Sequence, residues 1–143
     1  MRGSPAVALL GVVSIQTSSS PRPAARPITS SQRAKLRVRL EHELGELLVL
    51  ESQLRTQAAV ALESRRDSGT DESEDPEGSN MAFEGAQVTA MLEQTTRHAR
   101  EIASAMERID AGTYGDCANC SQSIGLGRLE ARPSSALCIS CAS

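Results

Sequence analysis

Four cysteines near the C-terminus are the residues whose type and spacing most clearly predict chemistry. They form two Cys-x-x-Cys pairs, Cys117 with Cys120 and Cys138 with Cys141, separated by seventeen residues. This spacing is typical of a zinc site, because each two-residue gap lets one tight turn aim two thiolates at the same ion. Four thiolates fill a tetrahedral shell and leave no open position. We therefore predict one Zn²⁺ with a structural role.

Two other uses of paired cysteines stay open at this stage. Two disulfides would suit a secreted protein, and each Cys-x-x-Cys also resembles a thiol-exchange motif. Neither use requires the doubled motif at this separation. We predict no enzyme activity, because His42 and His98 are isolated and the chain has no Gly-rich phosphate loop.

Two long segments with helical periodicity precede the cysteines. Residues 33–66 contain no Pro and a single Gly, and their apolar residues recur at helical spacing except where Glu51 interrupts. Residues 81–110 carry a coiled-coil seam with alternating spacings of four and three. That seam consists of Val88, Leu92, Thr95, Ala99, Ile102, Met106 and Ile109. We expect Ser30 or Ser31 to cap the first helix and Gly112 to end the second.

The composition favours an elongated, mainly α fold. The chain has no Trp, one Tyr and one Phe, so the aromatic side chains that usually fill a globular core are almost absent. A narrow seam of aliphatic residues needs no such side chains. We predict a long antiparallel two-helix coiled-coil hairpin at residues 33–110 and a small C-terminal four-cysteine zinc finger at residues 111–143.

The connection between the two predicted helices is strongly acidic. Residues 67–77 hold six acids and no base. Pro76 and Gly78 should break the helix there, so residues 67–80 would form the tip of the hairpin. The candidate partner-binding carboxylates are Asp71, Glu72, Glu74, Asp75 and Glu77. Such a run repels nucleic acid and favours a basic partner or a metal, although a solvated charged loop is the simpler explanation of the run alone.

The first 32 residues are predicted to be a disordered leader. Residues 6–15 form an apolar run behind Arg2 that has the length of a signal-peptide core, but no convincing cleavage site follows it. The run is far shorter than the roughly 20 residues of a membrane-spanning helix. Residues 17–32 are rich in Ser, Pro and Ala and cannot bury enough apolar area to offset their ordering entropy. We expect a cytoplasmic protein without a membrane segment.

Three short segments around the cysteines match one known pattern. They are 114–120 (YGDCANC), 128–133 (RLEARP) and 137–141 (LCISC), and 109–113 (IDAGT) precedes them. These segments resemble the zinc finger of the DksA/TraR transcription regulators. The resemblance extends over about residues 33–143.

The resemblance implies a regulator that binds RNA polymerase directly, without sequence-specific DNA contact. Members of this family insert the hairpin into the secondary channel of the polymerase and bring acidic tip residues toward the active centre, in some members together with ppGpp. The chain departs from the family's tip pattern D-P-x-D-x-A. Asp75 and Pro76 match it, but Gly78 and Asn80 replace the second Asp and the Ala.

A second function class is a zinc-finger module that binds nucleic acid or another protein. Arg128 and Arg132 could contact phosphate groups in that case. The finger lacks a basic stripe, however, which makes direct nucleic-acid binding the weaker hypothesis.

Overall fold

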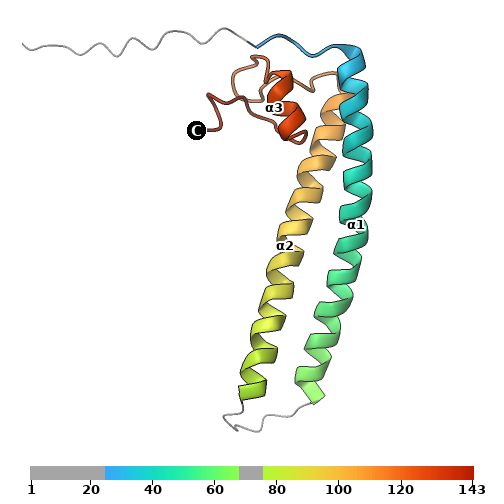
Figure 1. Ribbon diagram of the computed structural model, residues 1–143, viewed down its shortest axis with the longest axis vertical. Coiled ribbons are helices and arrows are strands. Elements are labelled where there is room, and N and C mark those ends of the chain that lie inside the picture. Colours follow the sequence, from blue (N-terminus) through green and yellow to red (C-terminus); the bar gives the residue numbers. More distant parts are fainter. Residues whose placement is uncertain (1–24, 68–75) are drawn as a thin grey trace, which may run out of the picture.

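The computed structural model describes residues 25–67 and 76–143 and has the shape of a rod with a small unit at one end (Figure 1). Helices α1 (Ser30–Asp67) and α2 (Pro76–Asp110) lie side by side and antiparallel, and the short helix α3 (Leu126–Ala131) lies beside their base. At 1.5 Å per residue, the two long helices are each about 50–57 Å long. This arrangement confirms the predicted mainly α hairpin with a small C-terminal unit.

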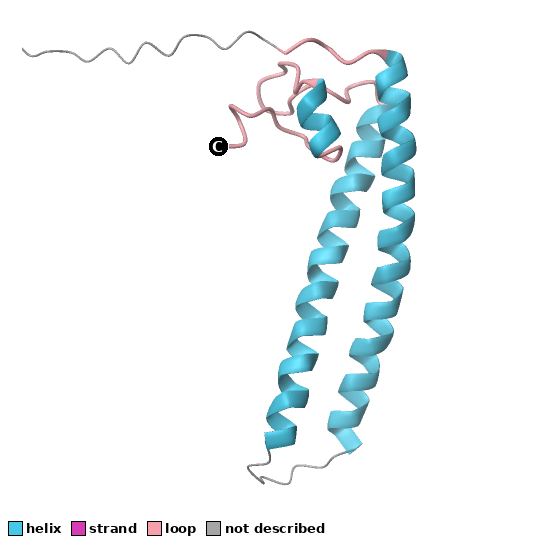
Figure 2. Ribbon diagram, in the orientation of Figure 1, coloured by secondary structure: helices cyan, strands magenta, loops and turns pink. Residues whose placement is uncertain are grey.

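Regular strands are absent from the described residues, and the finger segment is mostly loop (Figure 2). One isolated antiparallel bridge pairs Asp116 with Ser123. Within the same described ranges, no helix has both the length and the apolar character needed to cross a bilayer.

The first helix starts with a capping box at Thr29. The Thr29 Oγ1 accepts a hydrogen bond of 3.2 Å from the Gln32 N–H, and the Gln32 Oε1 accepts one of 2.8 Å from the Thr29 N–H. These reciprocal bonds satisfy two of the donors that a helix N-terminus leaves free. The predicted cap at Ser30 or Ser31 is therefore wrong by one or two residues.

The second helix starts earlier than its apolar periodicity indicates. It begins at Pro76, so the expected helix break at Pro76 and Gly78 is wrong. Proline is favoured in the first turn of a helix, because its missing N–H would have no partner there in any case. Gly78 and Asn80 are therefore helical residues rather than parts of a loop.

The second helix ends in a Schellman motif around Gly112, as predicted. The Thr113 N–H donates to the Arg108 carbonyl at 2.9 Å, and the Gly112 N–H donates to the Ile109 carbonyl at 3.1 Å. Gly112 has a φ of 76°, a left-handed conformation that costs glycine little. The chain leaves the helix at this turn and enters the finger.

The predicted seam of α2 faces α1. Of its seven members, Thr95, Ala99, Ile102 and Ile109 are buried and the other three are partly buried. From α1 the buried residues are Leu36, Leu40, Glu51 and Leu54. Glu51 does not point away from the seam, as an interruption would, but lies inside it. The Glu51 Oε1 accepts hydrogen bonds from the Thr96 hydroxyl at 2.8 Å and from Arg55 at 2.7 Å.

The described part of the predicted leader, residues 25–32, is not a free linker. Ile28 is buried in the same cluster as Leu36, Ile109 and Tyr114. The Arg26 carbonyl accepts a hydrogen bond of 3.0 Å from the Ser123 hydroxyl. The segment therefore packs across the base of the rod and contacts the finger before α1 begins. The apolar run at 6–15 lies outside the described residues.

Candidate metal centre

The structure brings the four cysteines together in one cluster. The Sγ atoms of Cys117, Cys120, Cys138 and Cys141 all lie within 4.8 Å of one another. The Cys120 and Cys138 sulfurs are 3.7 Å apart. A tetrahedral ion with bonds of about 2.3 Å to sulfur places its ligands about 3.8 Å from each other. The same separation is far longer than the roughly 2.05 Å of a disulfide bond.

Two tight turns aim the thiols at a common point. In the first turn, the Ser121 N–H donates to the Cys117 carbonyl at 2.9 Å, and Ser121 adopts a left-handed φ of 57°. In the second turn, the N–H groups of Cys141 and Ala142 donate to the Cys138 carbonyl at 3.2 and 3.0 Å. Each turn thus orients both cysteines of its pair toward one side, which explains the two-residue gap in each motif.

Backbone N–H groups also point at the sulfurs. The Cys138 N–H lies 3.3 Å from the Cys117 sulfur. This contact, together with the N–H groups of Cys120 and Asn119, lowers the pKa of the Cys117 thiol to about 6. The Gln122 N–H favours the Cys120 thiolate, but the neighbouring thiols and burial outweigh it and raise the pKa of Cys120 to about 12. Without a cation, four crowded thiols cannot all be ionised, because like charges at this distance repel.

The donor set fits a soft cation held in a closed shell. Thiolates are the ligands that zinc prefers in structural sites, and four of them leave no place for a water or a substrate. The side-chain amide of Asn119 lies 3.4 Å from the Cys141 sulfur and provides a further hydrogen bond around the cluster. Such outer contacts orient the ligands of a metal centre.

The thiol cluster is part of the hydrophobic base of the rod. Cys117 is buried in one cluster with residues of both long helices, and Cys138 and Cys141 pack against that cluster. Tyr114 is almost fully buried, and its hydroxyl donates a hydrogen bond of 2.8 Å to the Pro133 carbonyl. Burial raises the pKa of Tyr114, so the hydroxyl remains a hydrogen-bond donor.

Arg108 joins the end of α2 to the loop that precedes Cys138. Its guanidinium donates to the Ser134 carbonyl at 3.0 Å and to the Ser135 carbonyl at 3.1 Å, and it lies 5.9 Å from the centre of the Tyr114 ring. Burial lowers the pKa of Arg108, but an arginine stays charged in a protein. Hydrogen bonds from a charged donor to carbonyls in a partly buried site are among the stronger ones.

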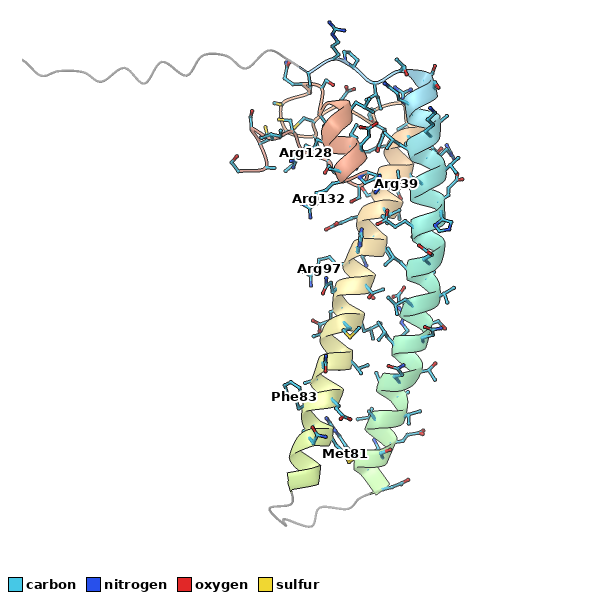
Figure 3. All side chains as sticks on the ribbon, in the orientation of Figure 1. Arg39, Met81, Phe83, Arg97, Arg128 and Arg132 are labelled. Atoms are coloured by element: carbon cyan, nitrogen blue, oxygen red, sulfur yellow. The ribbon has the colours of Figure 1, made fainter. Side chains whose placement is uncertain are left out.

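Two further arginines donate to carbonyls of the finger. Arg39 on α1 donates to the Glu130 carbonyl at 2.6 Å, and Arg128 on α3 donates to the Leu137 carbonyl at 2.8 Å. Arg39 lies beside the finger end of the rod, and Arg128 lies on α3 (Figure 3). The structural roles of Arg39 and Arg108 are not predicted from the sequence. The only sign of these roles in the sequence is a basic residue in the part of a long helix that lies next to the finger.

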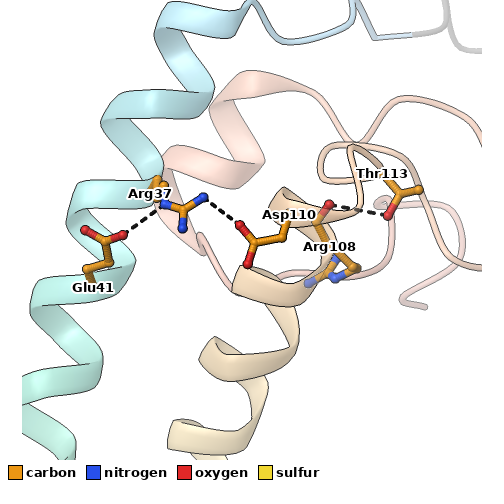
Figure 4. Close-up of polar contacts among 5 residues, drawn as sticks. All are labelled: Arg37, Glu41, Arg108, Asp110 and Thr113. Carbon is orange, nitrogen blue, oxygen red and sulfur yellow. Dashed lines mark hydrogen bonds and ion pairs between the residues drawn. The ribbon is translucent and has the colours of Figure 1, made fainter.

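An exposed ion pair also links the two helices at the base. The Arg37 guanidinium lies 2.7 Å from Asp110 on α2 and 2.9 Å from Glu41 on its own helix (Figure 4). Nearby, the Thr113 hydroxyl donates a hydrogen bond of 3.5 Å to the Arg108 carbonyl. The hydrogen bond with Asp110, followed by that with Glu41, raises the pKa of Arg37. Since these charges are exposed, the pairs contribute little to stability.

The predicted tip carboxylates are not placed by the structure. Asp71, Glu72, Glu74 and Asp75 lie outside the described residues. Glu77 belongs to the first turn of α2, and its side chain is not described. The structure therefore positions the helix ends Asp67 and Pro76, and the other four acidic residues lie between these ends in the sequence.

The fold and the thiol cluster define the class of protein, a small four-cysteine finger mounted on a coiled-coil arm. Comparison with known proteins agrees with this class. Residues 112–143 match the model of the prokaryotic dksA/traR C4-type zinc finger. The chain is also 40% identical, over 42 residues, to the RNA polymerase-binding transcription factor DksA of Haemophilus influenzae. That match spans 29% of this chain and 29% of the relative.

A solved structure extends the similarity to most of the chain. Transcription factor DksA2 from Pseudomonas aeruginosa is 25% identical, with a TM-score of 0.50, over 79% of this chain and 81% of that one. Its coverage includes the helical arm, which the finger model does not reach. Together these matches show a zinc finger of the dksA/traR type at residues 112–143 and a similarity to DksA proteins over most of the chain.

Proposed function

We propose that this protein regulates transcription by binding RNA polymerase directly and inserting its helical arm into the secondary channel. The observation that carries the proposal is the combination of a DksA-type finger with a rod about 50–57 Å long. Such a rod is too narrow to enclose a substrate, but it can reach into a channel of a larger partner. The named relative from Haemophilus influenzae is an RNA polymerase-binding factor.

The proposed role of the cysteines is structural. Cys117, Cys120, Cys138 and Cys141 would bind one Zn²⁺, for which their spacing and chemistry fit. When bound, the ion supplies the cross-link that holds the two turns of the finger together. The finger at residues 111–143 then forms the base from which the arm at residues 33–110 projects. Arg108 would connect that fixed geometry to α2 through its hydrogen bonds to the Ser134 and Ser135 carbonyls.

The proposed role of the acidic connection is electrostatic. Asp71, Glu72, Glu74, Asp75 and Glu77 would approach the basic, magnesium-containing channel of the polymerase. The protein itself would perform no catalysis and would recognise no DNA sequence. In line with the family resemblance, ppGpp would act as a co-regulator and the protein would act in the cytoplasm.

The first test is binding to core RNA polymerase from the same organism. We expect the zinc-loaded protein to co-purify with polymerase in a ratio close to one, with one zinc per chain in the same sample. DNA alone should bind weakly, whereas salt-sensitive DNA binding without polymerase would favour the nucleic-acid module instead. A failure to bind polymerase under conditions where the finger is folded would contradict the proposal.

The second test separates docking from the action of the tip. Replacing Asp75 and Glu77 by Ala should leave polymerase binding within about threefold but remove most of the effect on promoter-dependent transcription, with and without ppGpp. A matched variant, Glu63→Ala together with Glu84→Ala, removes two exposed charges from the arm outside the tip and should retain the effect. Equal activity of both double variants would remove the tip carboxylates from the mechanism.

A further inference from the structure

Arg65 reaches from the last turn of α1 to the backbone of α2. Its Nη2 lies 3.2 Å from the Ala82 carbonyl oxygen and 3.4 Å from the Met81 carbonyl oxygen. Both carbonyls belong to the first two turns of α2. Hydrogen bonds from a charged donor are stronger than neutral ones, so these contacts favour one separation of the two backbones.

Gly85 provides the space that Arg65 occupies. A Cβ atom at position 85 would lie 2.6 Å from the Arg65 Nη2 and 3.3 Å from its Cζ, which is closer than non-bonded atoms approach. The guanidinium borders a shallow recess of about 320 Å³ whose other lining residues all belong to α2. These lining residues include Ala82, Ala86 and Ala90. Glycine is unfavourable inside a helix, and at position 85 the close approach of Arg65 provides a local reason for it.

A second helical glycine shows the contrast. Gly45 lies in the middle of α1, and nothing approaches within 4 Å of the position where its Cβ would be. No contact within the described chain therefore requires a glycine at position 45. A side-chain contact thus explains the glycine at position 85 but not the glycine at position 45. Gly45→Ala is therefore a matched control for Gly85→Ala.

We propose that Arg65 and Gly85 form a latch that positions the distal ends of the hairpin. Arg65 lies two residues before the end of α1, and its acceptors lie five and six residues after Pro76. The latch therefore sets the distance and register of the two ends, Asp67 and Pro76, between which the acidic connection runs. Both are positioning residues, and their role in transcription rests on the proposed function above.

The alternative role for Arg65 is a favourable charge at the C-terminus of α1. Basic residues stabilise the last turn of a helix through its dipole. Arg66 lies in the same last turn and would provide the same benefit. A dipole effect needs no glycine on the other helix, so it predicts that the effects of Arg65 and Gly85 are independent.

The test is a double-mutant cycle on the zinc-loaded full chain, measured by hydrogen exchange of amides in residues 80–90. Arg65→Ala should speed this exchange about fivefold in the natural background. It should change exchange less than 1.5-fold in the Gly85→Ala background, because the added methyl group has already displaced the guanidinium. This comparison cancels the helix-stabilising effect of alanine itself, since both members of each pair share the same residue at position 85.

Two controls complete the cycle. Arg65→Ala should keep its full effect in the Gly45→Ala background, and Arg66→Ala should change exchange in residues 80–90 by less than twofold. Equal effects of Arg65→Ala in the natural background and in the Gly85→Ala background would overturn the latch. So would an effect of Arg66→Ala as large as that of Arg65→Ala.

A polymerase experiment then tests what the latch positions. Arg65→Ala should bind core polymerase within threefold of the unmodified protein but lose at least fivefold in its effect on transcription, whereas Arg66→Ala should retain both. If the unmodified protein does not bind polymerase, the proposed function fails and the exchange cycle still decides the latch. If the unmodified protein and Arg65→Ala act equally on transcription, the positioning role is wrong and the proposed function stands.

Discussion

The two halves of the hairpin share one sequence pattern but differ in how completely it is buried. Near the finger, Leu40, Ile102 and Ala105 are 0% exposed. Beyond the layer that contains Glu51, Leu54 is still only 4% exposed, but the seam residues Val88 and Leu92 are only partly buried. Met81 and Phe83 lie toward the distal end of α2 (Figure 3).

The difference has a simple geometric cause. Two helices in contact share one seam, and each seam residue touches only the opposite helix. At the base, the finger and residues 25–29 cover a further side of the same residues, which completes their burial. The stability of the arm is therefore expected to fall from its base toward its tip, and the latch at Arg65 lies where packing is weakest.

The largest effect should follow removal of the metal. Cys138→Ser, or chelation of the unmodified protein, should unfold the finger, because folding of such small units depends on metal binding free energy, typically about 10 kcal/mol or more. Amides of residues 111–143 and of the base seam should lose protection from hydrogen exchange, while residues 80–90 change little. Retained protection of the finger after complete removal of zinc would show that the finger does not need the ion.

Core truncations should measure the difference between the halves directly. Leu40→Ala removes a fully buried side chain at the base and should lower the free energy of unfolding by about 2–5 kcal/mol. Leu92→Ala removes a partly buried seam residue of the distal half and should cost about 1 kcal/mol. Urea unfolding followed by far-UV circular dichroism measures both. Equal losses would mean that the two halves are packed equally well.

Whether a feature of the two halves can be predicted from the sequence depends on how far apart in the chain the interacting residues are. The seam of α2 follows from a period of three and four, and the end of α2 follows from Gly112, because both are local signals. The cap at Thr29 is missed by one or two residues because several neighbouring side chains can serve. The contact of Glu51 with Thr96 requires the register of one helix against the other, which no local pattern fixes.

The candidate metal centre likewise has features that the sequence predicts and features that it does not. The four thiols are predicted from spacing alone, since two turns and one ion determine their geometry. The connection from Arg108 to the carbonyls of Ser134 and Ser135 is not, because the direction of a loop carbonyl depends on the finished fold. Gly85 is visible in the sequence as an exception within a helix, but its partner, twenty residues earlier, is not.

Loss of the Arg108 contacts should have an intermediate effect. Arg108→Met keeps much of the apolar stem but leaves the Ser134 and Ser135 carbonyls without their donor, which should cost about 1–3 kcal/mol. Arg100→Met, at an exposed position on the same helix, should change the free energy of unfolding by less than about 0.5 kcal/mol. The two variants are compared by urea unfolding of the zinc-loaded protein. A similar, small change in both would mean that Arg108 does not join the finger to the arm.

The smallest effect on stability is expected at Glu51, which marks the boundary between the halves. Glu51→Leu replaces a buried carboxylate by an apolar seam residue, and such replacements are often neutral or stabilising, here by about 0–1 kcal/mol. Glu51→Ala removes the acceptor of Thr96 without filling the space and should destabilise by about 1 kcal/mol. Polar residues in a seam specify register and partner number rather than strength. Glu51→Leu should therefore also increase self-association in sedimentation experiments. If Glu51→Leu destabilises as much as Glu51→Ala and self-association does not increase, the carboxylate contributes to the stability of the hairpin at the boundary between the two halves.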